Sequence, residues 1–348
     1  MKKLISLALT LMLALSLLTV SAMAESADSV LKAGVLTPLN KTEEDYTESG
    51  YTLWRIQLAQ EAGGDADTFF LALKDKPEQE FRHVFYDSLD SMLMALRAGE
   101  IQVMVTYEHV ADYLIAQSDD LALSSFFTFA ESDDPVSVFV SVILSNSFSL
   151  LLREEDEALR DELNGAILDM QADRTLQRFI DEQITAVNQG LEISPAALPR
   201  IEGTPVLRVA VTGTLPPMDY VTPDGAPAGF NTAMLAEIGN RIGRNIELVQ
   251  VDSVGRAAAL SAGVVDAVFW ARTGVTPDED AQASKEALAA ELERHREELP
   301  EEAFAILERF ISFFDSCTDS RLDMPEGTIV TVPYYAAPNR AVEMKAAQ

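Results

Sequence analysis

Short apolar runs alternate with amphipathic stretches between Leu207 and Thr276, and this alternation predicts a βαβαβ unit. Asn231 is expected to cap the first helix of the unit. The predicted elements are, in order, a strand over Leu207–Val211, a helix through Met234, Leu235, Ile238 and Ile242, a strand over Ile246–Val251, a helix over Ala257–Ala262 and a strand over Val264–Trp270. Such a unit leaves a crevice at the carboxyl ends of its strands, where ligands usually bind.

The N-terminal half carries a similar pattern. Strands are predicted over Leu31–Leu36, Phe81–Tyr86, Ile101–Val105, Val136–Ile143 and Phe148–Leu152, the fourth because its run is strongly β-branched. Helices are predicted over Tyr51–Glu61, from Leu89 to the stop at Gly99, over Glu155–Asp169 and in a last segment that ends near Ile184, and Phe126–Phe129 is a short apolar run. The pattern AL-x-AG followed by a β-rich run occurs at Ala95–Gly99 and again at Ala259–Gly263, which predicts two related domains.

Two further segments stand apart from this pattern. Gly190–Thr204 contains Pro195 and Pro199 and reads as a linker. Asp280–Phe314 is charged and broken by Pro300, and its apolar residues lie at helical spacing. This spacing predicts a hairpin of two helices that packs on its lobe, the alternative being a helix that binds a partner.

The N-terminus reads as a targeting segment. Lys2 and Lys3 precede the apolar run Leu4–Val20, and a small-residue cleavage site ends at Ala24. The alternative is an uncleaved anchor, because the run approaches membrane-spanning length. No cysteine follows the run to carry a lipid, so we expect cleavage after Ala24 and a periplasmic or secreted protein without stable membrane insertion. Cys317 is the only cysteine, which excludes an internal disulfide.

Composition limits the partners. The 348 residues have room for two ordinary domains, and 48% of them are hydrophobic, enough for packed cores. The formal net charge of −30 repels phosphate backbones, so nucleic acid is not expected as a partner. The acidity is typical of a soluble surface; attraction of cationic solutes is the alternative.

A set of residues over the βαβαβ unit occurs in the order of a known family motif. That motif reads roughly PPF-x-Y/F-x-D-x-x-G-x-x-x-GFD, then AL-x-x-G-x-x-D, then TITPER. The matching residues are Pro216, Pro217, Met218, Tyr220, Gly225, Gly229, Phe230, Asn231, Ala259, Leu260, Gly263, Asp266, Thr276 and Pro277. The stretch therefore resembles the first lobe of the family 3 extracytoplasmic solute-binding proteins, the amino-acid receptors of ABC importers.

The resemblance implies an α/β fold of the type II periplasmic-binding-protein kind, with hinge-crossing strands. The N-terminal half also resembles the family's closing segment, through Asn164, Asp173, Thr175 and Leu176, with Arg174 in place of a glycine. We therefore expect two units in tandem, the first compact but complete and the second lacking a second lobe. The expected boundaries are a signal peptide at 1–24, a solute-binding-like domain at 25–189, a linker at 190–205 and a second domain at 206–348, with the helical insertion at 280–314.

The resemblance also implies where a ligand would bind. In the family, the arginine that ends TITPER clamps a carboxylate, but here Asp278 and Glu279 occupy the last two positions of that motif. Arg272 is the nearby cation that could substitute, the alternative being an exposed loop arginine. The candidate ligand-binding residues, for most of which packing is the competing interpretation, are Met218, Tyr220, Phe230, Asn231, Trp270, Arg272, Thr276 and Tyr334.

The first half offers other polar residues at strand ends. Tyr86, Asp87, Thr106, Tyr107 and Glu108 would face a crevice there, although no arginine follows them. The chain has three histidines in separate segments and none of the common hydrolase, metalloprotease or phosphate-loop motifs. We therefore expect no catalytic residues, no metal and no cofactor.

These expectations combine into one function with two alternatives. The chain reads as an exported protein that captures a small polar solute, by resemblance an amino acid, for an ABC importer whose permease would be its partner. One alternative is a divergent extracytoplasmic sensor or interaction module without a transport ligand, because the arginine clamp is absent from both halves. A lyase-type enzyme on the same scaffold is a remote alternative.

Overall fold

The structure is a computed structural model that describes residues 30–42, 46, 55, 68, 81–124, 134–191, 193, 195–319 and 321–345. The signal peptide predicted at 1–24 and the run Phe126–Phe129 lie outside the described residues. So does the helix predicted over Tyr51–Glu61, of which only Arg55 is described. Within the described residues, no helix is both long enough and apolar enough to cross a membrane.

The described strands form one mixed sheet in the order β10-β6-β11-β5-β13-β3-β1-β2, with β12 beside β5 and β4 beside β13. One end of this sheet belongs to a lobe that we call lobe A, in which β1 pairs in parallel with β2 and β3. The elements of lobe A are β1 (Leu31–Leu36), β2 (Phe81–Tyr86), α4 (Leu89–Arg97), β3 (Val103–Tyr107), α5 (Glu108–Gln117) and β4 (Leu121–Leu123).

The other end of the sheet belongs to lobe B, in which β6 pairs in parallel with β10 and β11. The elements of lobe B are β5 (Ser145–Arg153), α7 (Glu157–Ala172), α8 (Thr175–Phe179), a π-helix (Ile180–Thr185), α9 (Ala186–Asn188), β6 (Val206–Val211), α10 (Phe230–Ile242), β10 (Asn245–Gln250), α11 (Arg256–Ser261), β11 (Ala267–Thr273) and β12 (Thr328–Val330). A small antiparallel sheet of β7 (Thr214–Leu215), β8 (Asp219–Val221) and β9 (Pro227–Ala228) precedes α10.

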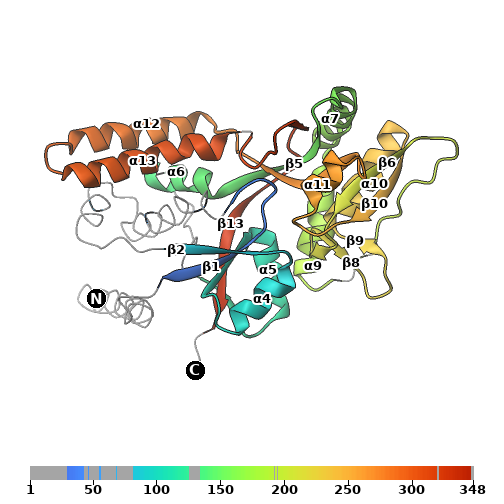
Figure 1. The fold of residues 1–348 in the computed structure, drawn as a ribbon, viewed down its shortest axis with the longest axis horizontal. Coiled ribbons are helices and arrows are strands. Elements are labelled where there is room, and N and C mark those ends of the chain that lie inside the picture. Colours follow the sequence, from blue (N-terminus) through green and yellow to red (C-terminus); the bar gives the residue numbers. More distant parts are fainter. Residues whose placement is uncertain are drawn as a thin grey trace, which may run out of the picture.

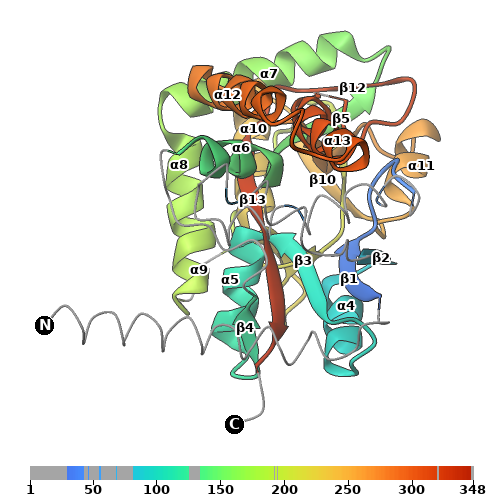
Figure 2. The same ribbon diagram turned by 90° about the vertical axis from the view of Figure 1, so that its left-hand side faces the viewer.

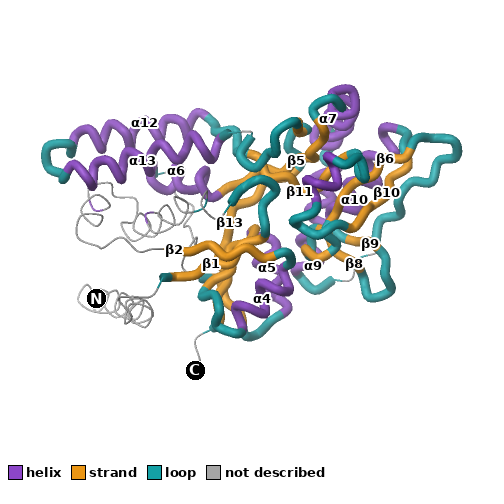
Figure 3. The backbone as a smooth tube through the Cα atoms, in the orientation of Figure 1, coloured by secondary structure: helices purple, strands orange, loops and turns teal. Residues whose placement is uncertain are grey.

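A single long strand, β13 (Tyr335–Met344), joins the two lobes. Its first residues pair with β5, and its last residues pair with β3 and β4 (Figure 2). Figure 3 shows the strands of the two lobes meeting where β13 passes β5. The predicted α/β class, the βαβ units and the hinge-crossing strand are therefore confirmed.

The strand pairing also joins the two halves of the sequence. β5 comes from the N-terminal half, yet it lies between β11 and β13 of the C-terminal half. The predicted boundary at residues 190–205 therefore does not separate two sheets. Within that segment, Ile201 exchanges two hydrogen bonds with the Asn245 side chain, of 2.7 and 2.9 Å, so part of the linker is fixed to lobe B.

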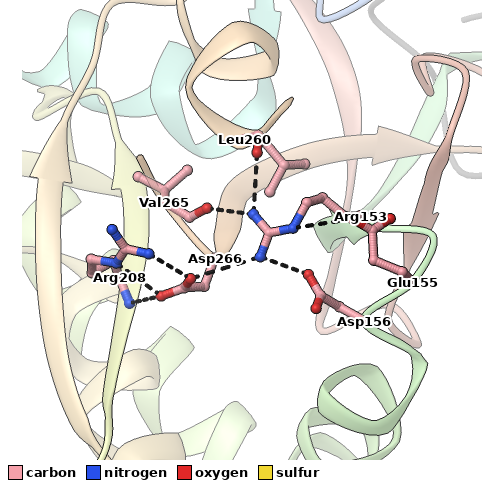
Figure 4. Close-up of polar contacts among 7 residues, drawn as sticks. All are labelled: Arg153, Glu155, Asp156, Arg208, Leu260, Val265 and Asp266. Carbon is pink, nitrogen blue, oxygen red and sulfur yellow. Dashed lines mark hydrogen bonds and ion pairs between the residues drawn. The ribbon is translucent and has the colours of Figure 1, made fainter. Parts of the chain in front are cut away.

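Arg153, the last residue of β5, makes a second connection between the halves (Figure 4). Its Nη1 donates to the carbonyl oxygens of Leu260 and Val265 at 3.1 and 2.8 Å, and its Nη2 lies 2.7 Å from an oxygen of Asp156. The neighbouring carboxylate of Asp266 accepts hydrogen bonds from the backbone and the side chain of Arg208. Asp266, which matches the family motif, thus fixes β6 against the turn before β11.

The segment Val136–Ile143, predicted as a core strand, is instead part of helix α6 (Pro135–Leu144), so this prediction was wrong. The side chain of Asp134 accepts hydrogen bonds from the backbone nitrogens of Val136 and Ser137, and Pro135 sits in the first helical turn. These two residues favour helix initiation and outweigh the β propensity of the run.

The predicted helical hairpin is confirmed as α12 (Glu279–Arg294) and α13 (Glu301–Thr318). The two helices run beside each other over α6 (Figure 1). Their apolar faces share a core with α6 and with Leu31, Val103 and Ala341 of the lobe A sheet. The prediction that the hairpin packs on its own lobe was therefore wrong: it follows a strand of lobe B but packs on lobe A.

The predicted helix cap at Asn231 was also wrong. The N-cap of α10 is Gly229, whose φ is 97°, and Asn231 lies in the first turn and is fully buried. A Cβ at Gly229 would lie 2.6 Å from the carbonyl oxygen of Pro217, so only glycine fits this approach. The tight turn therefore fixes where α10 begins.

Candidate functional site

A cavity of about 350 Å³ lies between the two lobes. Lobe A contributes residues at the carboxyl ends of its parallel strands, among them Thr37 after β1 and Tyr107 at the end of β3. Lobe B contributes Thr212, which follows β6, and Trp270 and Arg272 near the end of β11. Both lobes thus present the strand ends at which α/β sheets usually bind ligands.

Two arginines of lobe B line this cavity. Arg256 begins α11 and is buried; it donates to the carbonyl oxygens of Ser253, Phe269 and Trp270, each at 3.4 Å. Arg272 donates from Nη2 to the hydroxyl of Tyr46 at 3.0 Å. Within the described residues, neither guanidinium has a carboxylate oxygen within 4.0 Å. The guanidinium groups of Arg256 and Arg272 therefore have no ion-pair partner among the residues that the structure describes.

Electrostatics leaves both arginines charged. Burial lowers the pKa of Arg256. Burial also lowers the pKa of Arg272, but Tyr46 and Asp323 raise it by more, so its net pKa lies above the ordinary value. An arginine guanidinium stays protonated in proteins in either case.

The carboxylates that line the cavity are already engaged. Asp219 is buried and accepts hydrogen bonds from the backbone nitrogens of Thr212 and Gly213, at 2.7 and 3.0 Å. Burial raises the pKa of Asp219. Asp323 accepts from the backbone nitrogens of Leu39 and Asn40 at 2.9 and 2.8 Å. These carboxylates hold loops of the cavity wall in place.

Trp270 forms an aromatic wall of the cavity. Its ring stacks on Phe148 with centroids 3.9 Å apart, and Tyr107 meets its edge at 5.4 Å. The backbone of Trp270 has a φ of 67°, where the register between β11 and β5 shifts, and its N–H donates to the hydroxyl of Tyr334 at 3.0 Å. This left-handed conformation is rare for a bulky residue, and such outliers cluster at functional sites.

Several buried polar atoms of the lining have no partner in the described structure. They are Nε1 of Trp270, Oγ1 of Thr106 and Nδ1 of His83. Burial and, secondly, the charge of Arg272 lower the pKa of His83 to about 4, so its ring is neutral near pH 7. Buried polar groups are normally hydrogen-bonded, so these three unpaired atoms are exceptions that cluster in residues of the cavity wall.

The structure separates the candidate residues into two groups. Trp270 and Arg272 line the cavity. Tyr334 supports Trp270 from behind, and Thr276 is exposed beyond the strand. The remaining candidates do not line the cavity: Met218, Phe230 and Asn231 are buried in the lobe B core, and half-buried Tyr220 pairs with Thr214 in the small sheet. Their role in binding a ligand stays a prediction.

The polar strand ends of the first half divide in the same way. Asp87, Thr106 and Tyr107 line the cavity, whereas Tyr86 and Glu108 do not. Glu108 instead binds Arg340 of β13 at 2.6 Å.

Sequence reasoning missed Arg256. It lies at the start of the Ala-rich segment Arg256–Ser261, where an arginine resembles a solvent-facing helix residue. The sequence carries no motif that marks this arginine, because its position depends on the fold of the loop before α11.

Asp278 and Glu279, which occupy the last two positions of the family motif, belong to the start of a helix in this chain. The side chain of Asp278 accepts a hydrogen bond from the backbone nitrogen of Ala281 at 2.8 Å and caps α12. Glu279 is the first residue of that helix and is exposed. Neither residue lines the cavity, so the position that carries the family's arginine is a helix start in this chain.

Comparison with known families agrees with the resemblance seen in the sequence. Residues 207–284 match the model of the bacterial extracellular solute-binding proteins, family 3. The match covers the βαβαβ unit of lobe B and the first residues of α12. A search of curated proteins found no match.

Solved structures of low sequence identity also align with the chain. The ligand-binding component of an ABC-type import system from Staphylococcus aureus, with zinc bound, is 9% identical, with 91% of this chain and 66% of that chain covered and a TM-score of 0.36. The VFT2 domain of BvgS from Bordetella pertussis is 12% identical, with 93% and 84% covered and a TM-score of 0.36. The GluR0 ligand-binding core in complex with L-glutamate is 11% identical, with 92% and 87% covered and a TM-score of 0.32. This chain therefore spans just under two thirds of the first of these structures.

Within the described residues, no cluster of three or more His, Cys, Asp or Glu side chains is arranged to hold a metal ion.

Proposed function

We propose that this chain is an exported solute-binding protein, which captures a small polar solute between its lobes and presents it to an ABC importer. The observation that carries the proposal is the cavity between lobes A and B, lined by the strand ends of both. The match of residues 207–284 to the solute-binding family supports it. A volume of about 350 Å³ is at the small end of ligand pockets, and suits a metabolite rather than a peptide.

The proposed mechanism is closure of the two lobes around the solute. The lobes are connected through β13 and β5, which can act as the hinge. The hydroxyl of Ser253 in lobe B donates to the carbonyl oxygen of Asp87 in lobe A at 3.0 Å, so the lobes touch at the rim of the cavity. A solute that contacts both walls would favour this closed arrangement, which an importer permease would then recognise.

The family resemblance implies an amino acid as the first ligand class to test. In this proposal Arg272 takes the place of the arginine that the motif lacks, and Trp270 contacts the rest of the solute. Export through the predicted signal peptide at 1–24 places the protein in the periplasm or outside the cell.

Thermal unfolding of the purified protein against amino acids and small organic acids tests the proposal. A ligand at a hundred times its Kd should add roughly 2.7 kcal/mol to the free energy of unfolding. Arg272→Ala should abolish the shift, whereas Arg160→Ala, which removes a surface charge on α7, should leave it unchanged. If no compound shifts the unfolding midpoint, solute capture is refuted and a sensor or interaction module becomes the better interpretation.

A further inference from the structure

The two arginines that line the cavity have unpaired nitrogen atoms, and these can only donate hydrogen bonds. Within the described residues, Nη2 of Arg256 and both Nε and Nη1 of Arg272 make no hydrogen bond to the protein. These groups require a ligand that supplies acceptors, and guanidinium groups pair best with a carboxylate.

The cavity is poor in groups that could receive an ammonium. The carboxylates of Asp219 and Asp323 are buried and hold backbone N–H groups of the cavity wall. Asp87 is exposed at the rim, where it accepts from the hydroxyl of Thr37 at 3.1 Å. No carboxylate of the described lining is thus both buried and unoccupied, and a buried ammonium without such a partner would be costly.

The lining also includes large apolar side chains. They are Trp270, Leu215, Ile143 and Leu144, all of which are buried. A carbon body packed on this surface would gain about 25 cal/mol for each Å² of apolar surface removed from water.

We propose that the solute of this cavity is a small organic acid without an ammonium group, held through its carboxylate by Arg256 and Arg272 and through an apolar or aromatic body by Trp270. This inference rests on the proposed function and narrows it from amino acids to non-aminated carboxylates. It follows from which polar groups of the cavity are free and which are occupied.

Calorimetric titration with matched pairs of compounds tests the substrate class. The pairs are phenylpyruvate against phenylalanine and succinate against aspartate, with benzylamine as an amine that has no carboxylate. The acid of at least one pair should bind about tenfold or more tightly than its aminated counterpart, and benzylamine should not bind. That ratio corresponds to about 1.4 kcal/mol, within what one unpaired buried ammonium costs.

Variants test the assignment of the arginines. Arg272→Gln should weaken binding of the acid by about tenfold to a hundredfold, as expected for loss of a charged hydrogen-bond partner. Arg256→Gln should do the same, but Arg256 also holds three carbonyl oxygens, so Arg272→Gln decides the question if Arg256→Gln does not fold. Arg97→Gln removes an exposed charge that is paired with Asp120, and serves as the control.

The outcomes separate this inference from the proposed function. If phenylalanine or aspartate binds as tightly as its deaminated counterpart, the inference is overturned while solute capture stands. If the acid binds equally well to Arg272→Gln, the arginine assignment is overturned. If no compound binds, in this panel or in the broader one, solute capture and the inference fall together.

Discussion

Replacement of Arg153 by methionine should destabilise the whole protein, because this side chain ties β5 of the N-terminal half to the turn before β11 of the C-terminal half. Nη1 of Arg153 donates hydrogen bonds to the carbonyl oxygens of Leu260 and Val265, two residues that are fully buried. Methionine has a similar length and keeps the apolar packing of the stem, so the substitution removes mainly the polar interactions.

The magnitude follows from the hydrogen bonds and the ion pairs that the substitution removes. Hydrogen bonds from a charged group contribute about 1.5–3 kcal/mol, and the two carbonyl oxygens here share one donor nitrogen. The ion pair with Asp156 at 2.7 Å and the longer ones with Asp266 at 3.7 Å and Glu155 at 3.8 Å are all partly exposed, and together they add no more than about 1 kcal/mol. We therefore expect Arg153→Met to lower the free energy of unfolding by about 2–4 kcal/mol. Arg160→Met removes only a pair with the exposed Asp161 and should cost less than about 1 kcal/mol.

Urea unfolding, followed by far-UV circular dichroism and by tryptophan fluorescence, measures the effect. If the halves share one sheet, Arg153→Met should move the transitions seen by both probes together. A loss below about 1 kcal/mol, or a shift in only one of two separate transitions, would refute the reasoning that Arg153 joins the halves in a cooperative unit.

Three further predictions address the linker, a strained residue and a buried histidine. A protease site can be inserted beside the exposed Gly203, in the predicted linker. After cleavage there, the two fragments should elute together in gel filtration, because β5 of the N-terminal half lies between strands of the C-terminal half. Separate elution of the fragments would contradict the shared sheet. Arg174→Gly should stabilise the protein by about 0.5–1 kcal/mol in thermal unfolding, because Arg174 has a φ of 65° and glycine removes that strain. As a control, Arg178→Gly within α8 should destabilise the protein by about 1 kcal/mol. If Arg174→Gly destabilises the protein instead, no strain is stored at Arg174. The pKa of His83 is lowered to about 4, below the unfolded value of 6.5, so protonation favours unfolding and stability should fall as pH drops below about 6.5. Between about pH 7.5 and 5.5 this contributes about 1 kcal/mol, measured as the difference in urea midpoints between wild type and His83→Phe; equal pH dependence of the two proteins would exclude His83 as the cause.

Sequence pattern predicted local structure well where turn chemistry and apolar spacing agreed. In the βαβαβ unit from β6 to β11, no boundary of the three predicted strands differs by more than three residues from the structure, whereas β7, β8 and β9 were predicted as loop. The prediction of a strand over Val136–Ile143 was wrong because residue propensity and turn chemistry conflicted there. Its β-branched residues favour a strand, but Asp134 and Pro135 start a helix, and α12 and α13 cover its sides.

Tertiary pairing could not be read from the sequence in the same way. The similarity between Ala95–Gly99 and Ala259–Gly263 predicted two related domains, but it did not show that strands of both halves belong to one sheet. That depends on β5 and β13, whose partners lie up to 238 residues away (Val342 and Met104, 342 − 104) and leave no periodic signal. The resemblance to the solute-binding family, whose motifs follow one another in a fixed order along the chain, favoured the interpretation of two domains in tandem.

The residues that line the cavity could be predicted only in part, because strand ends can be located from the sequence and tertiary contacts cannot. Trp270 ends a predicted strand and Arg272 lies just past it, while Asp87, Thr106 and Tyr107 lie at strand ends of the other unit; all five line the cavity, and their role in ligand binding stays a prediction. Arg256 was missed because its role depends on the fold of the loop before α11, not on a motif.

The helical hairpin explains why the cavity has a different set of cations from the family motif. Because α12 begins at Glu279, Asp278 is used as a helix cap and the next position is carried away from the cavity. The chain that returns from α13 brings Asp323 to the cavity wall, where it fixes the loop after β1. With the position of the motif arginine lost, only Arg256 and Arg272 among the described lobe B residues of the lining carry a positive charge. The insertion thus accounts for the loss of the motif arginine from the cavity, and on the proposed function we expect Arg272 on β11 and Arg256 on α11, rather than the end of the motif, to govern what the cavity binds.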